Sequence, residues 1–312
     1  MESLQMALNV VVPMFLMLAL GCLLRRIGMF DQHTLDKMND VCFKVFMAPL
    51  LYYNIYTART PIGESGRMLL FAVVSELLLF TALWIITVVI EKENPRRAAL
   101  LQGLFRTNAV LFCTAIGTSI LGEGNIGPIS LLVSVVVPLY NVLTVIELEI
   151  FRGGKIKPGK IALGVLKNPY IVAAILGYLT VALRIQLPVP VVTSLRDITR
   201  CSTPVALMVL GGLFNFGAVR GNLRNIIVGV AGRLVIVPAI MLPITIWMGF
   251  RGVELVGLMG MFVAPTAVAS FNMAHAMDAD YDLAGHLVVF GTMFSVVTIF
   301  FWVFGLGYLG FV

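Results

Sequence analysis

Two polar strings interrupt apolar segments of the chain, and the first could bind an anion. Arg106-Thr107-Asn108 stands inside a hydrophobic stretch that continues through Ala109 to Leu121. An arginine at that depth in a bilayer costs about 2.5 kcal/mol or more unless it is paired or hydrated. One interpretation is that Arg106 faces an internal cavity and attracts an anion, while Asn108 caps the helix that follows. The other is a structural arginine that bonds carbonyl groups at the break or reaches the membrane edge.

The second string, Ala264-Pro265-Thr266, lies in a later apolar segment and is followed by Ser270 and Asn272. Proline removes one helical hydrogen bond and clashes with the preceding turn, so the sequence predicts a broken helix near Pro265. Thr266 and Asn272 could then donate hydrogen bonds to a carboxylate. Broken helices are tolerated inside a membrane only where protein or a water-filled cavity satisfies the freed backbone groups.

The two strings belong to an internal repeat. Residues 101–108 resemble residues 258–265 at an offset of 157. Other pairs lie at nearly the same offset: Pro13 and Gly21 with Pro169 and Gly177, Pro49 with Pro204, and Glu76 with Arg233. A half with an odd number of membrane spans re-enters the membrane in the opposite orientation, so duplication predicts an inverted repeat.

The composition places the helices that carry these strings in a membrane. Hydrophobic residues make up 59% of the 312 residues and charged residues 12%, against about 25% charged residues in soluble domains. Apolar stretches of roughly 20 residues are long enough to cross a bilayer. The sequence predicts ten of them, at about 6–25, 35–57, 67–90, 98–121, 126–150, 169–187, 191–217, 223–249, 252–277 and 283–311.

The net charge of +6 follows mainly from topology. Most lysines and arginines fall on one set of alternate loops, for example at Arg25, Arg96, Arg152 and Arg224. The positive-inside rule places these loops in the cytosol and both termini outside. Nucleic-acid binding has no support. The segment 152–168 is predicted to be a cytosolic linker between two halves, 1–151 and 169–312, and residues 161–167 could form an amphipathic helix on the inner leaflet.

Two further intramembrane charges, Glu76 and Arg233, occupy equivalent repeat positions. They are interpreted as a mutual ion pair, as a proton or counter-ion role for Glu76, or as neither. Asn141 could reach the same site. Glu147 and Glu149 stand near the end of their segment and are expected to face solvent.

No enzyme motif was found. The sequence has no H-E-x-x-H, G-x-S-x-G, Walker or dinucleotide-binding string. Four cysteines, Cys22, Cys42, Cys113 and Cys201, have no paired spacing and are expected to be free, with no metal site.

Taken together, these strings resemble the auxin efflux carrier family, which contains the plant PIN-type auxin exporters and bacterial organic-acid permeases. The resemblance rests on four strings: Val12-Pro13 with Gly21 and Arg25-Arg26, Arg106-Thr107-Asn108, Pro138-Leu139-Tyr140-Asn141, and Ala264 to Phe271. It implies an all-α polytopic membrane protein with ten transmembrane helices in two inverted five-helix repeats, as in bile-acid symporters and Na⁺/H⁺ antiporters. Helices 4 and 9 would be broken and would cross. Helices 1, 2, 6 and 7 would form a scaffold, and helices 3–5 and 8–10 a moving transport unit.

The sequence departs from the usual family pattern at Cys113-Thr114-Ala115, Asn272 and His275, and its linker is short. A plant hormone is therefore not the default substrate.

The expected function is secondary transport of a small organic anion, a malate- or malonate-like carboxylate or an auxin-like acid, by elevator-type alternating access. The predicted substrate-binding residues are Arg106, Thr107, Asn108, Asn141, Pro265, Thr266, Ser270 and Asn272. A sodium-coupled organic-anion symporter is the alternative within transport, and a membrane receptor or scaffold is the alternative of another class. No enzyme activity and no cofactor are expected, and the coupling ion, H⁺ or Na⁺, is open. The expected location is the plasma (inner) membrane, with a homodimer formed through the scaffold helices.

Overall fold

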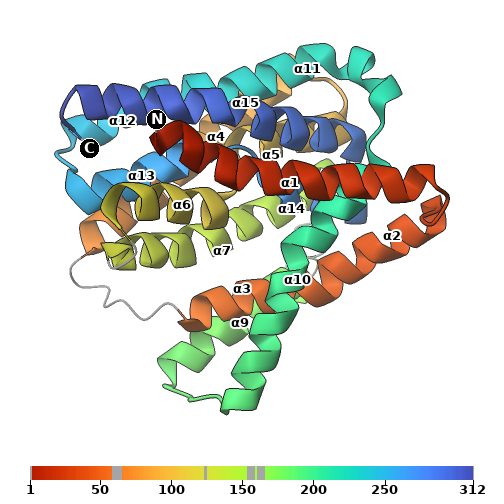
Figure 1. Cartoon of the computed structure of the whole chain (residues 1–312), viewed down its shortest axis with the longest axis horizontal. Coiled ribbons are helices and arrows are strands. Elements are labelled where there is room, and N and C mark those ends of the chain that lie inside the picture. Colours follow the sequence, from red (N-terminus) through yellow and green to blue (C-terminus); the bar gives the residue numbers. More distant parts are fainter. Residues whose placement is uncertain (1, 58–64, 123–124, 153–158, 160–165, 312) are drawn as a thin grey trace.

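A computed structural model describes residues 2–57, 65–122, 125–152, 159 and 166–311 of the chain, and the elements of these ranges are helices joined by short turns (Figure 1). Most of the predicted linker 152–168, including residues 161–165 of its proposed amphipathic helix, lies outside the described residues. The first half contains α1 (Glu2–Arg26), α2 (Gln32–Val41), the π-helical turn η1 (Cys42–Phe46), α3 (Met47–Thr57), α4 (Gly66–Ile90), α5 (Asn94–Phe105), α6 (Ala109–Leu121) and α7 (Gly127–Phe151). The second contains α9 (Pro169–Ala182), α10 (Val189–Leu213), the 3₁₀ turn η4 (Phe216–Ala218), α11 (Val219–Ala231), the π-helical turn η5 (Gly232–Ile236), α12 (Val237–Trp247), α13 (Gly252–Val263), α14 (Val268–Ala276) and α15 (Tyr281–Tyr308).

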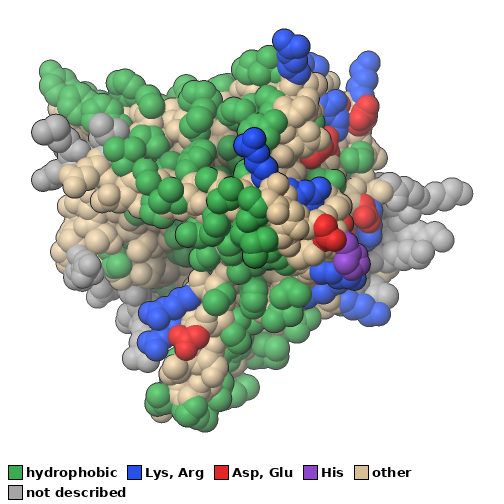
Figure 2. All heavy atoms as spheres, turned by 45° about the vertical axis from the view of Figure 1, so that its right-hand side comes forward, with side chains coloured by type: hydrophobic (Ala, Val, Ile, Leu, Met, Phe, Trp, Pro, Cys, Tyr) green, Lys and Arg blue, Asp and Glu red, His purple; other side chains and the backbone are tan. Residues whose placement is uncertain are grey.

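The outer surface of the bundle is apolar, as a lipid-facing surface must be. Leu78 on α4 and Phe301 on α15 are exposed, and Figure 2 shows hydrophobic side chains spread widely over the face in view. Trp247 and Tyr308, at the ends of α12 and α15, are 83% and 84% exposed, as is typical of aromatic residues at a membrane–water boundary. Among the described residues, five helical segments are long and apolar enough to cross a bilayer. They are Leu8–Arg26, Gly66–Ile90, Gly127–Phe151, Phe216–Trp247 and Tyr281–Tyr308.

Glycines allow two helix pairs to approach closely. On α1 and α10, a Cβ atom added to Gly21 would lie 2.0 Å from the carbonyl oxygen of Met208, and one added to Gly211 would lie 2.0 Å from that of Leu18. Similarly, a Cβ atom added to Gly177 on α9 would lie 3.1 Å from the Cβ atom of Ile55 on α3. Small residues at such crossings are how membrane helices gain van der Waals contact. These contacts join α1 to α10 and α3 to α9.

Replacing Gly21 by alanine is expected to force α1 and α10 apart, because the atoms that it would meet are backbone and cannot rotate away. Overpacking of this kind costs about 1–3 kcal/mol, and we expect a lower midpoint of thermal unfolding in detergent. The matched control is Gly305→Ala in α15, where an added Cβ meets no heavy atom within 4 Å. An unchanged midpoint for Gly21→Ala would show that this crossing is looser than the structure has it.

Pro138 inside α7 frees the carbonyl group of Ser134, four residues earlier. The hydroxyl group of Tyr178 on α9 donates a hydrogen bond to that carbonyl oxygen at 3.1 Å. The Tyr178 hydroxyl group therefore satisfies the carbonyl oxygen that the proline frees, and this hydrogen bond joins α9 to α7.

Candidate functional site

Both predicted helix breaks are present. The first separates α5 from α6 at Arg106-Thr107-Asn108, where Arg106 has an extended backbone (φ −84°, ψ 111°). The second separates α13 from α14, with Ala264 extended at φ −62° and ψ 143°. Proline disfavours the α conformation of the residue before it, so Pro265 explains why α13 ends where it does.

The two breaks cross and pair with each other through their backbones. Thr107 and Thr266 form an isolated antiparallel bridge. The backbone N–H of Asn108 donates to the carbonyl oxygen of Pro265 at 2.8 Å, and that of Ala267 donates to the carbonyl oxygen of Arg106 at 3.2 Å. These bonds satisfy backbone groups that the broken helices leave free. Figure 1 shows α6 beside α13 and α14 beside α5.

The crossing brings together the two residues that the sequence placed opposite each other, Asn108 and Pro265. The strands at the two breaks run antiparallel, so the pair of Thr107 with Thr266 stands next to the pair of Asn108 with Pro265. The break at Pro265 contains residues 264–267, and the break at Asn108 contains residues 106–108.

A double variant, Thr107→Cys with Thr266→Cys, is expected to form a disulfide on mild oxidation. Hydrogen bonds flank this pair on both sides, so it is a non-hydrogen-bonded antiparallel pair with Cα atoms about 4.5 Å apart, within the span of a disulfide. Intact mass under non-reducing conditions measures the bond, and each single cysteine variant is the control. Failure to cross-link in the folded protein would contradict the paired crossing.

Arg233 satisfies the carbonyl groups at the ends of both half-helices. This side chain, 2% exposed, lies in η5. Its Nε donates to Ala264 O at 2.9 Å, its Nη2 donates to Met261 O at 2.8 Å and Phe262 O at 2.9 Å, and its Nη1 donates to Leu104 O at 3.3 Å. The guanidinium thus stands at the negative ends of the α5 and α13 dipoles. A π-helical turn often marks such a specialised position.

The mutual ion pair of Glu76 with Arg233 is not what the structure shows. The guanidinium bonds to four carbonyl oxygens instead, and Glu76 is a buried neighbour on α4 whose charge acts on it electrostatically. Glu76 Oε1 has no hydrogen-bond partner among the described residues. For Arg106, one interpretation of the sequence was a structural arginine that bonds carbonyl groups at the helix break. In the structure, Arg233 makes bonds of this kind.

A cavity of about 100 Å³ lies against the crossing. Arg106, Thr107, Asn108, Tyr140 and Asn141 line it, together with the first turns of α6 and α14. The cavity is also lined by residues of α3, α9 and α10, which are Met47, Leu50, Leu51, Asn54, Tyr170, Thr203 and Ala206. Two half-helix N-termini, each with free N–H groups and a positive dipole end, therefore border the same space.

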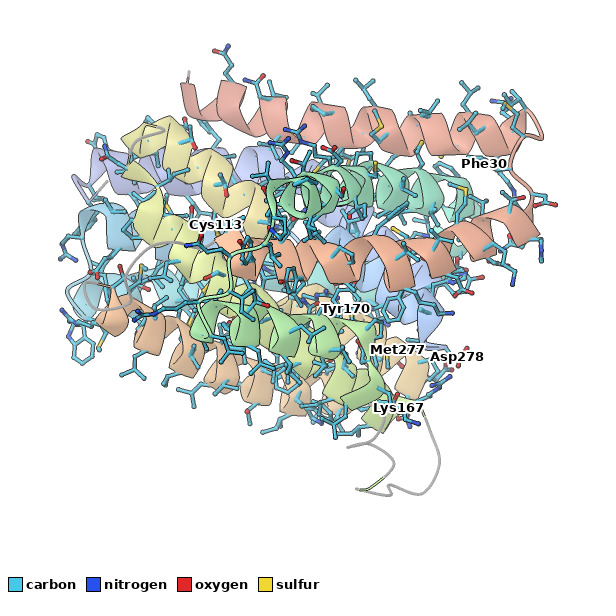
Figure 3. The ribbon with its side chains drawn as sticks, turned by 90° about the horizontal axis from the view of Figure 1, so that it is seen from below. Phe30, Cys113, Lys167, Tyr170, Met277 and Asp278 are labelled. Atoms are coloured by element: carbon cyan, nitrogen blue, oxygen red, sulfur yellow. The ribbon has the colours of Figure 1, made fainter. Side chains whose placement is uncertain are left out.

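Arg106 is the charged group of this cavity. It is 4% exposed, and its Nη2 donates to Asn141 Oδ1 at 2.5 Å while Nη1 contacts Met273 Sδ at 2.9 Å. Both partners are neutral. The Tyr170 hydroxyl lies against the guanidinium, and Figure 3 shows Tyr170 in the interior of the bundle. The charge is therefore available to an anion in the cavity.

The other predicted site residues divide into two groups. Thr107 lines the cavity and donates to Tyr140 Oη at 3.2 Å, and Asn108 lines it without capping α6 through its side chain. Asn108 is thus the N-cap residue of α6, as predicted, but without a capping hydrogen bond from its side chain. Thr266 donates to Gly103 O at 2.8 Å, so its hydroxyl closes the crossing rather than pointing to a ligand. Pro265 contributes its carbonyl oxygen to the crossing.

Ser270 and Asn272 lie away from the cavity lining. Ser270 is buried with an unpartnered hydroxyl group. Asn272 Nδ2 donates to Asn39 Oδ1 at 2.7 Å, and Asn39 Nδ2 donates back to the Asn272 carbonyl oxygen at 3.3 Å. The predicted contact of Asn272 with a carboxylate is thus wrong, since its amide ties α14 to α2. One turn further along α14, His275 Nε2 lies 3.1 Å from Asp36 Oδ1, which is a second contact between α14 and α2.

Sequence reasoning missed several groups at the site. Tyr140, Tyr170 and Asn54 line the cavity. Tyr140 belongs to the Pro138-Leu139-Tyr140-Asn141 string but was not assigned to the site, and nothing in the local sequence distinguishes Tyr170 and Asn54 from packing residues. Glu147, expected to face solvent, is fully buried. Glu149 is partly exposed and lies 4.0 Å from Arg152.

The described residues contain no group of three or more His, Cys, Asp or Glu side chains arranged to hold a metal ion. The four cysteines are free.

Comparison with protein families gives a match. The model of a family described as membrane transport protein matches residues 6–303, nearly the whole chain. No curated protein matches the sequence.

Proposed function

The chain belongs to the membrane transport protein family of the auxin efflux carriers, and from this premise we propose that it is a secondary transporter of small organic anions. One observation carries the proposal: Arg106 and the N-termini of α6 and α14 border a single cavity. A carboxylate in that cavity would accept hydrogen bonds from backbone N–H groups and from the guanidinium. The small cavity favours a mono- or dicarboxylate of malonate or malate size over a bulky acid.

The substrate would bind where two parts of the molecule meet. In this proposal α1, α2, α3, α9 and α10 form a scaffold, and α4 to α7 with α11 to α15 form the transport unit. The cavity has walls from both parts, so a sliding movement of one part past the other would carry the anion from one side of the membrane to the other. This is elevator-type alternating access, with the crossing moving as a rigid body.

Two contacts support the inverted repeat of ten spans. The pair α1 with α10 joins spans 1 and 7, and the pair α9 with α3 joins spans 6 and 2. If the two halves are exchanged, span 1 becomes span 6 and span 7 becomes span 2, so the two pairs are equivalent. Gly21 lies at the first contact and its repeat partner Gly177 lies at the second. The bridge between Thr107 and Thr266 joins the two broken helices that are equivalent in the same exchange.

The proposed orientation has both termini outside the plasma membrane. The N- and C-terminal ends of the described chain lie at the same end of the bundle in Figure 1. The turns that follow α1 and α14 lie at the other end, where Figure 3 places Phe30 and Asp278. Figure 2 shows Lys, Arg, Asp and Glu side chains gathered on that side. Basic residues at the ends of α1 and α7 fit a cytosolic location. Dimer formation through the scaffold helices stays a prediction.

The function is tested with purified protein and a panel of organic acids. A ligand that binds only the folded protein raises the midpoint of thermal unfolding, and an acid found in this way should then exchange across proteoliposomes by counterflow. Repeating both measurements with sodium replaced by potassium separates a sodium-coupled symporter from the proposal. Binding without counterflow would favour a receptor, and a chemically changed ligand would favour an enzyme; either result contradicts a transporter.

A further inference from the structure

Two apolar grooves lie next to each other on the surface of the bundle, apart from the cavity at the crossing. The first, of about 510 Å³, lies between α1 and α15. The second, of about 440 Å³, lies between α11 and α15. Phe290 of α15 lines both grooves, and Figure 1 shows α15 beside α1 and α11. A molecule with two apolar chains can therefore place one chain on each side of this phenylalanine.

The first groove follows one face of α1 for the depth of one membrane leaflet. The α1 residues that line it share a helical face, and they are Phe15, Leu18, Ala19, Cys22, Leu23 and Arg26. At 1.5 Å per residue, Phe15 and Arg26 are about 16 Å apart along the helix. This is about half of the 30 Å hydrocarbon core of a bilayer. The groove thus runs from an arginine at headgroup depth to apolar residues near the middle of the membrane.

The chain that leaves α10 forms the other side of this groove. Cys22 Sγ donates a hydrogen bond to the carbonyl oxygen of Gly211 at 3.0 Å, and Gly211 lines the groove. Phe214 and Phe216 line it as well, with ring centroids 4.7 Å apart. The Phe216 side chain is 73% exposed. An acyl chain in the groove would cover these apolar surfaces.

Arg26 is the charged residue among those that line the two grooves. It is exposed, and its side chain makes no hydrogen bond or ion pair among the described residues. Its neighbour Arg25, in contrast, donates to Gln32 Oε1 at 3.1 Å. On α15, the carboxylate of Asp282 accepts a hydrogen bond from Asn215 Nδ2 at 3.0 Å. The Arg26 guanidinium is therefore free to bind an anionic group from outside the chain.

The second groove opens at the same end of the bundle. Val219, at the start of α11, lines it and follows Phe216 of the first groove by three residues. Arg220 and Arg224 in the first turns of α11 are exposed. Basic pockets between membrane helices on the cytosolic side are typical of sites for anionic lipid headgroups. Both grooves thus combine a basic end with an apolar length.

We propose that the two grooves bind one anionic phospholipid of the cytosolic leaflet, with its phosphate at Arg26 and one acyl chain in each groove. The inference uses the proposed orientation of the chain but not the proposed substrate. Because α1 belongs to the proposed scaffold and α11 and α15 to the proposed transport unit, the bound lipid would contact both parts.

Native mass spectrometry in an uncharged detergent tests the site, because it counts bound lipids without a charged bilayer surface. With equal amounts of phosphatidylglycerol and phosphatidylcholine added, the protein should carry one phosphatidylglycerol, preferred about fivefold. Arg26→Gln should remove this preference. The matched control is Lys37→Gln, which removes one positive charge from an exposed position of α2 outside both grooves, and it should keep the preference. Ala19→Phe, which fills the first groove, should reduce the binding of both lipids.

An equal preference in Arg26→Gln and the unaltered protein would overturn the proposal, and so would a loss of preference in Lys37→Gln as large as that in Arg26→Gln. Full lipid binding by Ala19→Phe would show that the first groove does not hold a chain. Should Ala19→Phe not fold, Leu23→Trp fills the same groove from a position that is 52% exposed. Displacement of the lipid by soluble glycerol phosphate would indicate a site for a free anion and would also contradict the proposal. The lipid is counted without any organic acid present, so a failure of the proposed transport function leaves this result unaffected.

Discussion

Replacing Arg233 by glutamine is expected to destabilise the protein more than any other exchange considered, by about 3–5 kcal/mol. The guanidinium bonds to four carbonyl oxygens, of Leu104, Met261, Phe262 and Ala264. Glutamine can satisfy only one or two of them, and each acceptor left buried and unpaired costs about 1–3 kcal/mol. The midpoint of thermal unfolding should fall by about 6–12 °C or more.

The matched control is Arg196→Gln on α10. Arg196 is an exposed side chain that faces Asp197 at 3.9 Å, and exposed ion pairs contribute about 0–1 kcal/mol. Its unfolding midpoint should stay close to that of the unaltered protein. A small effect of Arg233→Gln, equal to that of the control, would mean that the crossing is held by something other than this arginine.

Replacing Arg106 by glutamine is expected to weaken binding of an organic acid by about 30-fold or more, with a much smaller loss of stability than at Arg233. Removing one partner of a desolvated charge pair costs about 2–5 kcal/mol, and each 1.4 kcal/mol is tenfold in affinity. The fold should tolerate the exchange, because the direct partners of Arg106 are the neutral groups of Asn141 and Met273. Glutamine can still bond to Asn141.

Isothermal titration with the tightest-binding acid measures this effect, and Arg106→Lys should retain part of the affinity because it retains the charge. The control is Arg251→Gln, an arginine in the turn before α13 that bonds to the carbonyl oxygens of Ile246 and Phe250. Its affinity should be unchanged. Equal affinity for Arg106→Gln and the unaltered protein would remove Arg106 from the binding site.

The sequence predicted the two breaks because the signals are local. Pro265 cannot continue a helix, and Arg106 cannot stay unpaired in an apolar segment. Their meeting was predicted from the proposed repeat. The orientation of side chains around the breaks did not, since it depends on which residues pair. In the crossing, the Thr266 hydroxyl group donates to Gly103 O and does not line the cavity, although Thr266 pairs with Thr107, which does.

Other errors came from contacts between segments distant in sequence. Glu147 appeared to be near a solvated end, but it is fully buried in the bundle. Arg233 was paired with Glu76 by repeat position, whereas the carbonyl groups that it bonds become free only when two helices end beside it. Asn272 was assigned to the substrate because α2, which carries its partner Asn39, could not be placed against α14 from sequence alone.

The most direct test of the account is an experimental structure of the protein with the tightest-binding acid, preferably a brominated analogue whose position is unambiguous. The account predicts a carboxylate in the cavity, within hydrogen-bond distance of Arg106 and of backbone N–H groups in the first turns of α6 or α14. An acid bound elsewhere, with this cavity closed or filled by side chains, would contradict it.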